Sequence, residues 1–390
     1  MEKVNTIFAI IILIIVVGCK GDKKSTDEFI TVDITKSYTS KKELILQDFM
    51  DVEYIPLETN DNFVNQGFVM DMGKEIILVK NITNDGDIFI YDRHGKALRK
   101  FNRKGQGGEE YLYILNLALD EDKGEIFIND HYSQKIIVYD LFGNFKRRFK
   151  YQKNKEELFY TDMFNYDKDN LICYNRLNKE IGFVLVSKQD GSITKEIKIP
   201  FKEKKSLMKQ LIDQSGGVYS VSPDAYSSII NFKGNWILTE YSSDTVYTLL
   251  PDYIIKPFIV RTPSIQSMNP EDFLVLRFFS DRYYFMETVR NEYNFDTREG
   301  FPTTSFIMYD KHENTFFGYN VYNGDFSTKK EIYMNFFTSL NYEIGSWYPL
   351  ESFRLVESLK KGELIGKLKE IATTLDEESN RVIMLVKHKK

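Results

Sequence analysis

The sequence predicts an all-β protein: a six-bladed β-propeller of four-stranded blades, with a short helical insertion near the C-terminus. Three observations support this fold class: an internal repeat, a composition rich in strand-forming aromatic residues, and a length that suits six blades. Of the 390 residues, 30 are Phe and 25 are Tyr, whereas only 9 are Pro, which favours strands. Hydrophobic residues make up 42% of the chain, which excludes a disordered protein and indicates a large core.

Charge and cysteine content exclude several functions. The chain has 52 Lys and Arg against 57 Asp and Glu, a net charge of -5. It therefore has no strong basic field to attract phosphates, and we expect no nucleic-acid partner. Two Cys exclude a disulfide scaffold and four His leave little material for a zinc site, so we assign no metal ligands. Cys173 lies in an apolar run, and we expect it to be a buried core residue.

The N-terminus carries a targeting signal. Residues 7–17 form an uninterrupted apolar run, too short to span a bilayer but suited to the core of a signal peptide. Val16-Val17-Gly18-Cys19 then resembles the lipobox of bacterial lipoproteins, which implies cleavage before Cys19 and lipidation of that residue. The alternative is an ordinary signal peptide with an incidental Cys. We expect a signal peptide over residues 1–18, a lipidated Cys19 with a tether over 19–45, and the propeller over 46–390.

The repeat is clearest in three segments that each read as a strand, a turn ending in Gly, and a second strand. Their glycines, Gly95, Gly143 and Gly191, recur at one fixed spacing. Each segment is typical of a β-hairpin, and Gly is the residue that tolerates positive φ at the turn. Another apolar strand pair precedes each hairpin, over residues 67–79, 117–129 and 163–174. Four strands in a period of about 48 residues match one propeller blade.

The remaining blades are weaker copies of the repeat. Residues 231–250, 305–310 and 382–386 supply strands for the fourth, fifth and sixth blades. Residues 352–374 carry leucines at helical spacing, which predicts one or two short helices. Residues 52–58 are expected to complete the last blade and close the ring. The roughly 345 residues that follow the tether divide into six units of about 57 residues, a blade plus insertions.

Four segments together resemble one family. They are residues 54–59, the Tyr-Asp-x-x-Gly turns, the glycine-rich loop over 105–111, and the ending over 380–386. They are similar to the six-bladed β-propeller lipoproteins of Gram-negative bacteria, related to NHL-type propellers. Arg381 and Gly108 stand where that family tends to have Pro. The resemblance implies an outer-membrane lipoprotein, on the periplasmic or the surface side, and is specific for fold but weak for function.

Two short segments are candidate ligand-binding sites. Asp130 and His131 follow a strand end, where propellers often place ligand-facing groups, although an ordinary turn is the alternative. Trp347 and Tyr348 lie in a segment bounded by Gly and Pro. As a loop, this segment could stack on a sugar ring and offer hydrogen bonds, although core aromatics look identical in sequence.

The sequence favours a binding protein over an enzyme. It contains neither a Gly-x-Ser-x-Gly nor a His-Glu-x-x-His motif, and we assign no catalytic residues. We expect a lipid-anchored envelope module that binds a glycan, a peptide or an outer-membrane protein. The alternative is an envelope hydrolase, glycan-active or lactonase-like, with its site at the central channel. A lactonase-like site would need a hard cation such as Ca²⁺ held by channel carboxylates.

Overall fold

The structure is a computed structural model that describes residues 29–151, 158–212, 216–223, 226–334, 338–339 and 343–389. The predicted signal peptide, Cys19 and the segment before Phe29 lie outside these residues. Across the described ranges, no helix is long and apolar enough to cross a membrane.

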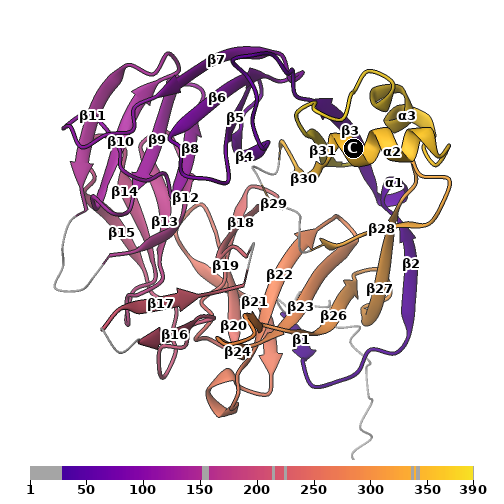
Figure 1. The fold of residues 1–390 in the computed structure, drawn as a ribbon. Coiled ribbons are helices and arrows are strands. Elements are labelled where there is room, and N and C mark those ends of the chain that lie inside the picture. Colours follow the sequence, from indigo (N-terminus) through magenta and orange to yellow (C-terminus); the bar gives the residue numbers. More distant parts are fainter. Residues whose placement is uncertain are drawn as a thin grey trace, which may run out of the picture.

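Six blades, each with four antiparallel strands, surround a central axis, as predicted (Figure 1). Each of the first three blades is formed by consecutive strands, as in β4 (Phe68–Met72), β5 (Ile76–Lys80), β6 (Asp87–Asp92) and β7 (Ala97–Asn102) of blade 1. Blades 2 and 3 repeat this order in β8 (Asn116–Asp120), β9 (Glu125–Asp130), β10 (Lys135–Asp140) and β11 (Phe145–Lys150), then in β12 (Tyr160–Asn165), β13 (Asn170–Asn175), β14 (Phe183–Ser187) and β15 (Ile193–Ile197).

Blades 4 and 5 follow the same scheme, with a long outer strand in blade 4 and four long strands in blade 5. They contain β18 (Ile229–Phe232), β19 (Asn235–Leu238), β20 (Thr245–Leu249) and β21 (Ile255–Thr262), then β22 (Asp272–Phe279), β23 (Tyr283–Arg290), β26 (Thr303–Asp310) and β27 (Thr315–Asn323). A 3-10 helix, η1 (Ile265–Ser267), joins the two blades. The short strand β28 (Lys330–Ile332) pairs with β27.

Blade 6 closes the ring, as predicted. It combines β29 (Thr338–Ser339), β30 (Ser346–Leu350) and β31 (Val382–His388) with the early strand β3 (Met50–Pro56). β3 pairs with β31 from Met50 opposite His388 to Pro56 opposite Val382, so the two ends of the fold share one sheet. The predicted helices are α2 (Ser352–Lys360) and α3 (Gly366–Ala372).

The sequence repeat has a physical cause in the packing of neighbouring blades. Gly143 has a φ of +78°, and a Cβ there would lie 2.6 Å from the Phe101 ring of the preceding blade. Gly191, with a φ of +75°, packs in the same way against Phe149. Glycine and aromatic ring therefore recur as a pair, one from each of two adjacent blades.

The tether prediction is wrong for residues 30–45. β1 (Ile30–Asp33) runs parallel to β21 and adds a fifth strand to blade 4, and β2 (Lys41–Ile45) runs parallel to β27 in blade 5. A short helix, α1 (Leu46–Phe49), leads into β3. Lys42 in β2 forms a 2.8 Å ion pair with the buried carboxylate of Asp310. The polar composition of this segment fits its outer-edge position, because only one of its sides is covered.

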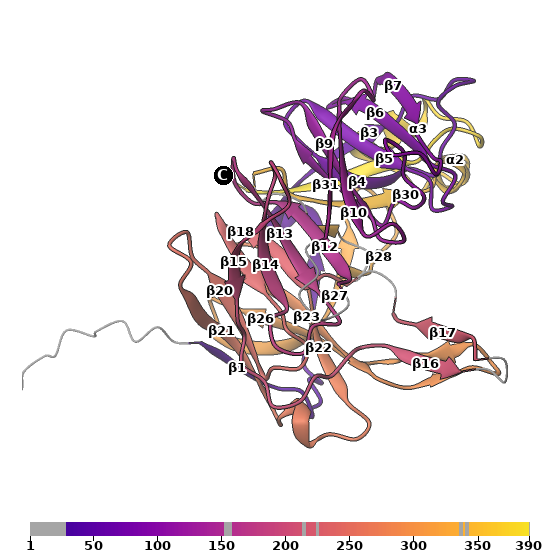
Figure 2. The same ribbon diagram turned by 90° about the vertical axis from the view of Figure 1, so that its left-hand side faces the viewer.

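Two additional hairpins are inserted between blade strands. β16 (Lys209–Ile212) and β17 (Val218–Val221) form a hairpin that projects from one face of the propeller (Figure 2). β24 (Tyr293–Asn294) and β25 (Glu299–Gly300) lie in the connection between β23 and β26. Neither hairpin follows the repeat, and neither was predicted from the sequence.

Candidate functional site

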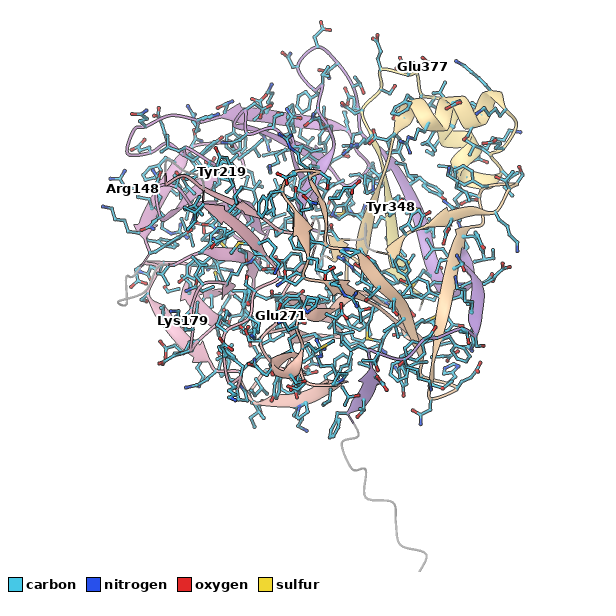
Figure 3. The ribbon with its side chains drawn as sticks, turned by 60° about the horizontal axis from the view of Figure 1, so that its bottom comes forward. Arg148, Lys179, Tyr219, Glu271, Tyr348 and Glu377 are labelled. Atoms are coloured by element: carbon cyan, nitrogen blue, oxygen red, sulfur yellow. The ribbon has the colours of Figure 1, made fainter. Side chains whose placement is uncertain are left out.

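The aromatic pair proposed for sugar stacking lies in a strand rather than in a loop. Trp347 and Tyr348 belong to β30. Trp347 is 2% exposed, belongs to the core cluster shared by blades 6 and 1, and packs edge-on against Phe68 with ring centroids 6.0 Å apart. Tyr348, labelled in Figure 3, is partly buried. The Trp347 ring therefore offers no open face to a sugar in this structure.

The Asp130 and His131 pair shapes a turn at the end of β9. Asp130 is fully buried, and its carboxylate accepts hydrogen bonds from the backbone N–H of Leu112 at 2.9 Å and of Ser133 at 3.3 Å. His131 is partly buried and packs on Phe159 with ring centroids 4.2 Å apart. The carboxylate is directed at backbone amides, so the structure supports the turn that the sequence left as the alternative.

Cys173 is fully buried in the core of blades 2 and 3, as expected. Burial raises the pKa of its thiol far above the ordinary value. Because the thiolate is the reactive form, Cys173 is an inert core residue.

A cavity of about 300 Å³ lies where the inner strands of blades 1 to 4 end. Its walls come from the ends of β4, β8, β12 and β18, with one side chain from β19 and two residues that precede β30. The polar and aromatic side chains that line it are Asp71, Lys74, Glu121, Asp122, Phe164, Asn165, Asn231, Trp236 and Glu343. Four of these side chains are acidic and one is basic, so the cavity is acidic. We call it the channel cavity.

Asp71 is the most perturbed carboxyl group of the channel cavity. It lies near the end of β4, and its two oxygens accept hydrogen bonds from the backbone N–H of Leu119 at 2.7 Å and of Met72 at 2.8 Å. Burial raises the pKa of Asp71 to about 6, the nearby charge of Glu121 adds to this, and the two backbone hydrogen bonds oppose it. The carboxyl group therefore changes its charge close to neutral pH.

Glu121 orders the turn beside Asp71. Its two oxygens accept hydrogen bonds from three consecutive backbone amides of the β4–β5 turn, those of Lys74, Glu75 and Ile76, at 2.7, 2.9 and 2.9 Å. This side chain from blade 2 therefore fixes the rim of blade 1. Lys74 in turn approaches Glu343 of blade 6 at 3.5 Å, so the rim connects three blades.

An amide and an aromatic stack form another part of the cavity wall. Asn165 donates a 3.1 Å hydrogen bond to the Leu119 carbonyl, whereas its own Oδ1 is buried and has no hydrogen-bond partner among the described residues. Trp236 is partly buried and stacks on Tyr166, with ring centroids 5.7 Å apart and planes at 29°. Tyr166 stacks in turn on Tyr253 of the β20–β21 turn. A spare amide oxygen thus lies in the same cavity wall as a large aromatic surface.

This site was not predicted from the sequence, although the repeat contains a signal for it. Asp71 and Leu119 are separated by one repeat and occupy equivalent positions, opposite Leu78 and Ile126 in their respective blades. An Asp in the place of an inner-strand Leu is a departure that the repeat exposes. Trp236 gave no comparable signal, because strand tryptophans are usually core residues.

The channel cavity can bind hydroxyl groups or positively charged groups. The side chains of Asp71 and Asn165 supply hydrogen-bonding groups, and Trp236 offers an apolar surface. In the part of the chain that the structure describes, no group of three or more His, Cys, Asp or Glu is arranged to hold a metal ion.

Fold and cavity together define the class of the protein: a six-bladed β-propeller with a cavity at one end of its central channel. Residues 29–387 match the family described as Domain of unknown function (DUF4934), and the chain belongs to that family.

Two solved structures of Bacteroides proteins are similar. A protein described as exported, from Bacteroides fragilis NCTC 9343, is 16% identical with a TM-score of 0.60, over 93% of this chain and 100% of that chain. A member of the DUF4221 family from Bacteroides vulgatus ATCC 8482 is 10% identical with a TM-score of 0.47, over 88% of this chain and 98% of that chain. The first likeness supports the propeller fold. No match was found among curated protein sequences.

Proposed function

We propose that this protein is a lipid-anchored envelope propeller that binds a glycan in the channel cavity. The observation that carries the proposal is the combination of the partly buried Trp236, the amide side chain of Asn165 and the carboxyl group of Asp71 in one cavity. Sugar rings present apolar C–H faces to aromatic rings and hydroxyl groups to amides and carboxylates, so these three groups complement a sugar. The volume of about 300 Å³ is at the lower end for ligand pockets, which suits the end of a glycan chain.

The path of the chain supports an orientation. β1 runs parallel to β21, and β21 follows the turn that contains Tyr253, which belongs to the aromatic stack beside the cavity. The chain therefore enters the fold from the face on which the cavity lies. A lipid on Cys19 would leave about ten residues before β1, which reach at most about 40 Å when extended. The anchor would keep the cavity close to an outer-membrane surface, periplasmic or external.

A hydrolase is a second candidate, and the raised pKa of Asp71 is the observation that favours it. A carboxyl group with a pKa of about 6 can act as a general acid near neutral pH. A glycosidase needs a second carboxyl group for its mechanism, and Glu121, Asp122 and Glu343 also line the cavity. Binding requires fewer groups in a defined catalytic geometry than turnover does, so we place binding first and test turnover with the variants below.

A single-tryptophan variant tests the binding function. The chain has two Trp, so Trp347→Phe leaves Trp236 as the only tryptophan emitter. Titrating this lipid-free variant with a panel of envelope and dietary oligosaccharides should change the Trp236 emission for one glycan class. In the wild-type chain, the same glycan at 100 times its Kd should stabilise the fold by about 2.7 kcal/mol.

Variants of the cavity, compared with a variant on the distant strand β17, show whether the glycan binds in the cavity. Asp71→Asn and Trp236→Ala should weaken glycan binding, whereas Tyr219→Ala on the exposed β17 should not. Product formation by the wild-type chain that is lost in Asp71→Asn would favour the hydrolase. A glycan that binds both cavity variants as well as it binds the wild type would show that the site lies elsewhere.

A further inference from the structure

Blade 5 is split between its third and fourth strands. β26 pairs with β27 at only three positions, from Met308 opposite Phe317 to Asp310 opposite Thr315. The equivalent strands of blades 1 and 2 pair at five positions each. Beyond Phe317, β27 diverges from β26 and pairs with β2 on one side and with β28 on the other. Figure 1 shows β27 beside β2 at the periphery of the ring.

The split leaves one edge of β26 open. Thr303 and residues 305–307 pair with β23 on one side, with a bulge at Thr304, and no strand of the described ranges pairs with their other side. A cavity of about 380 Å³ occupies this gap. It is bounded by residues 303–306 of β26, by residues 318–320 of β27, by residues 331–334, and by Ser37, Tyr38 and Lys41 of the N-terminal segment. We call this cavity the blade-5 slot.

The slot is lined by buried apolar residues, by polar groups and by two exposed aromatic residues, Phe306 and Tyr333. Tyr319, Ile332 and Met334 are 7%, 5% and 1% exposed and belong to one core cluster. The margins carry hydroxyl, amide and charged groups, from Ser37, Lys41, Thr303, Thr304, Ser305, Asn320 and Glu331. Such a lining suits a segment that places an apolar side chain inward and polar side chains on either side of it, which is the alternation of a β-strand.

We propose that the blade-5 slot binds an extended segment of a partner polypeptide, which joins blade 5 as an additional strand beside β26. An unpaired strand edge presents backbone N–H and C=O groups that another strand satisfies. The open edge of five residues is about 16 Å long, enough for a short peptide. Because the edge lies inside a cavity and not on an open surface, a single strand can reach it, whereas the sheet of a second copy of this chain cannot.

This site is separate from the channel cavity. The slot lies between the outer strands of blade 5, and its lining shares no residue with the channel cavity, whose walls come from blades 1 to 4 and from residues before β30. Peptide binding in the slot therefore does not depend on the proposed glycan binding, and Trp236→Ala should leave it unchanged.

A displayed library of random hexapeptides, selected on the full chain, tests the proposal. Ser305→Trp fills the slot with a bulky side chain, and Thr297→Trp, an exposed position in the β24–β25 turn, is the matched control. We expect selected hexapeptides to bind the wild type and Thr297→Trp equally, and Ser305→Trp at least tenfold more weakly. Methylating alternate backbone nitrogens of the peptide should weaken binding at least tenfold for the set that faces β26, because those N–H groups form the ladder.

Hydrogen exchange on the wild-type chain provides a readout that does not depend on the folding of Ser305→Trp. Addition of a selected hexapeptide should slow exchange in the fragment that contains residues 303–307 and not in a fragment from the β16–β17 hairpin. The proposal is wrong if no selected hexapeptide distinguishes the two tryptophan variants, or if protection appears at that hairpin instead. Unchanged affinity after either pattern of N-methylation would show recognition of side chains alone, which also excludes strand addition.

Discussion

The charge of Asp71 should make the stability of the protein depend on pH in the opposite direction from that of a typical salt-bridged carboxylate. Its pKa is about 6 in the native protein and has an ordinary value of 3.8. A native pKa above the unfolded one means that the native state holds the proton more tightly. The contribution of Asp71 to stability is therefore fully present below pH 3.8 and is lost as the pH rises through about 6.

The size of this effect follows from the two pKa values. Ionising Asp71 in its partly buried position costs about 3 kcal/mol once the pH is well above 6, and about 1 kcal/mol of this is already incurred at pH 4.5. Asp71→Asn cannot ionise. The free energy of unfolding of Asp71→Asn minus that of the wild type should therefore rise by about 2 kcal/mol between pH 4.5 and pH 8. The absolute difference also contains a loss that is independent of pH, because an amide nitrogen cannot accept the hydrogen bonds that both carboxylate oxygens accept.

Urea denaturation at several pH values measures this difference. Asp190→Asn is the control. Asp190 is exposed, and the hydrogen bonds that it accepts from Ser192 lower its pKa. The free energy of unfolding of Asp190→Asn minus that of the wild type should therefore fall or stay flat as the pH rises. A flat profile for Asp71→Asn would contradict the raised pKa of Asp71, because it would mean that water reaches the carboxyl group and cancels the effect of burial.

Three further variants test the packing around the cavity and between the blades. Glu121→Gln should lower the free energy of unfolding by about 1–3 kcal/mol, because it weakens the hydrogen bonds to the β4–β5 turn. It should also lower the pKa of Asp71 by removing a neighbouring charge. Denaturation at several pH values would detect this as a shifted midpoint of the pH dependence. Gly143→Ala should lower the midpoint of thermal unfolding more than Gly234→Ala does. Both glycines have positive φ, but only a Cβ at Gly143 would contact a neighbouring side chain, that of Phe101. Equal decreases would contradict the packing of Gly143 on the adjacent blade. Lys188→Met should lower the free energy of unfolding by about 3–5 kcal/mol, because it leaves the buried Asp120 without its 2.6 Å ion pair. The double variant with Asp120→Leu should recover most of this loss. No recovery would show that the two side chains do not act as a pair.

The repeat made most of the fold predictable. Glycine turns, strand alternation and a fixed period specify a blade, and the number of blades follows from the chain length. β1 and β2 were missed because a strand that lies on an outer edge is buried on one side and has no strong apolar pattern. The divergence of β27 was missed because its pairing partner, β2, lies near the opposite end of the described chain.

The candidate site was less predictable than the fold, for a physical reason. Trp347 and Trp236 look alike in sequence, yet the first is 2% exposed in a core cluster and the second lines a cavity. Which of them meets a ligand depends on where neighbouring blades converge, and no local pattern encodes that. Asp71 differs from the two tryptophans, because the repeat places it where another blade has an apolar residue. That departure can be found from the sequence alone.

The two proposed sites fit one way of holding the propeller at a membrane. The chain enters the fold from the face that carries the channel cavity, so a lipid on Cys19 would turn this cavity towards the membrane surface. The blade-5 slot lies between outer strands at the periphery of the ring, where a partner anchored in the same membrane can approach from the side. A glycan and a protein strand could then be bound together, because neither site obstructs the other. Measuring the affinity of a selected hexapeptide with and without saturating glycan tests this arrangement. Equal affinities are expected, whereas mutual exclusion would show that the two sites compete.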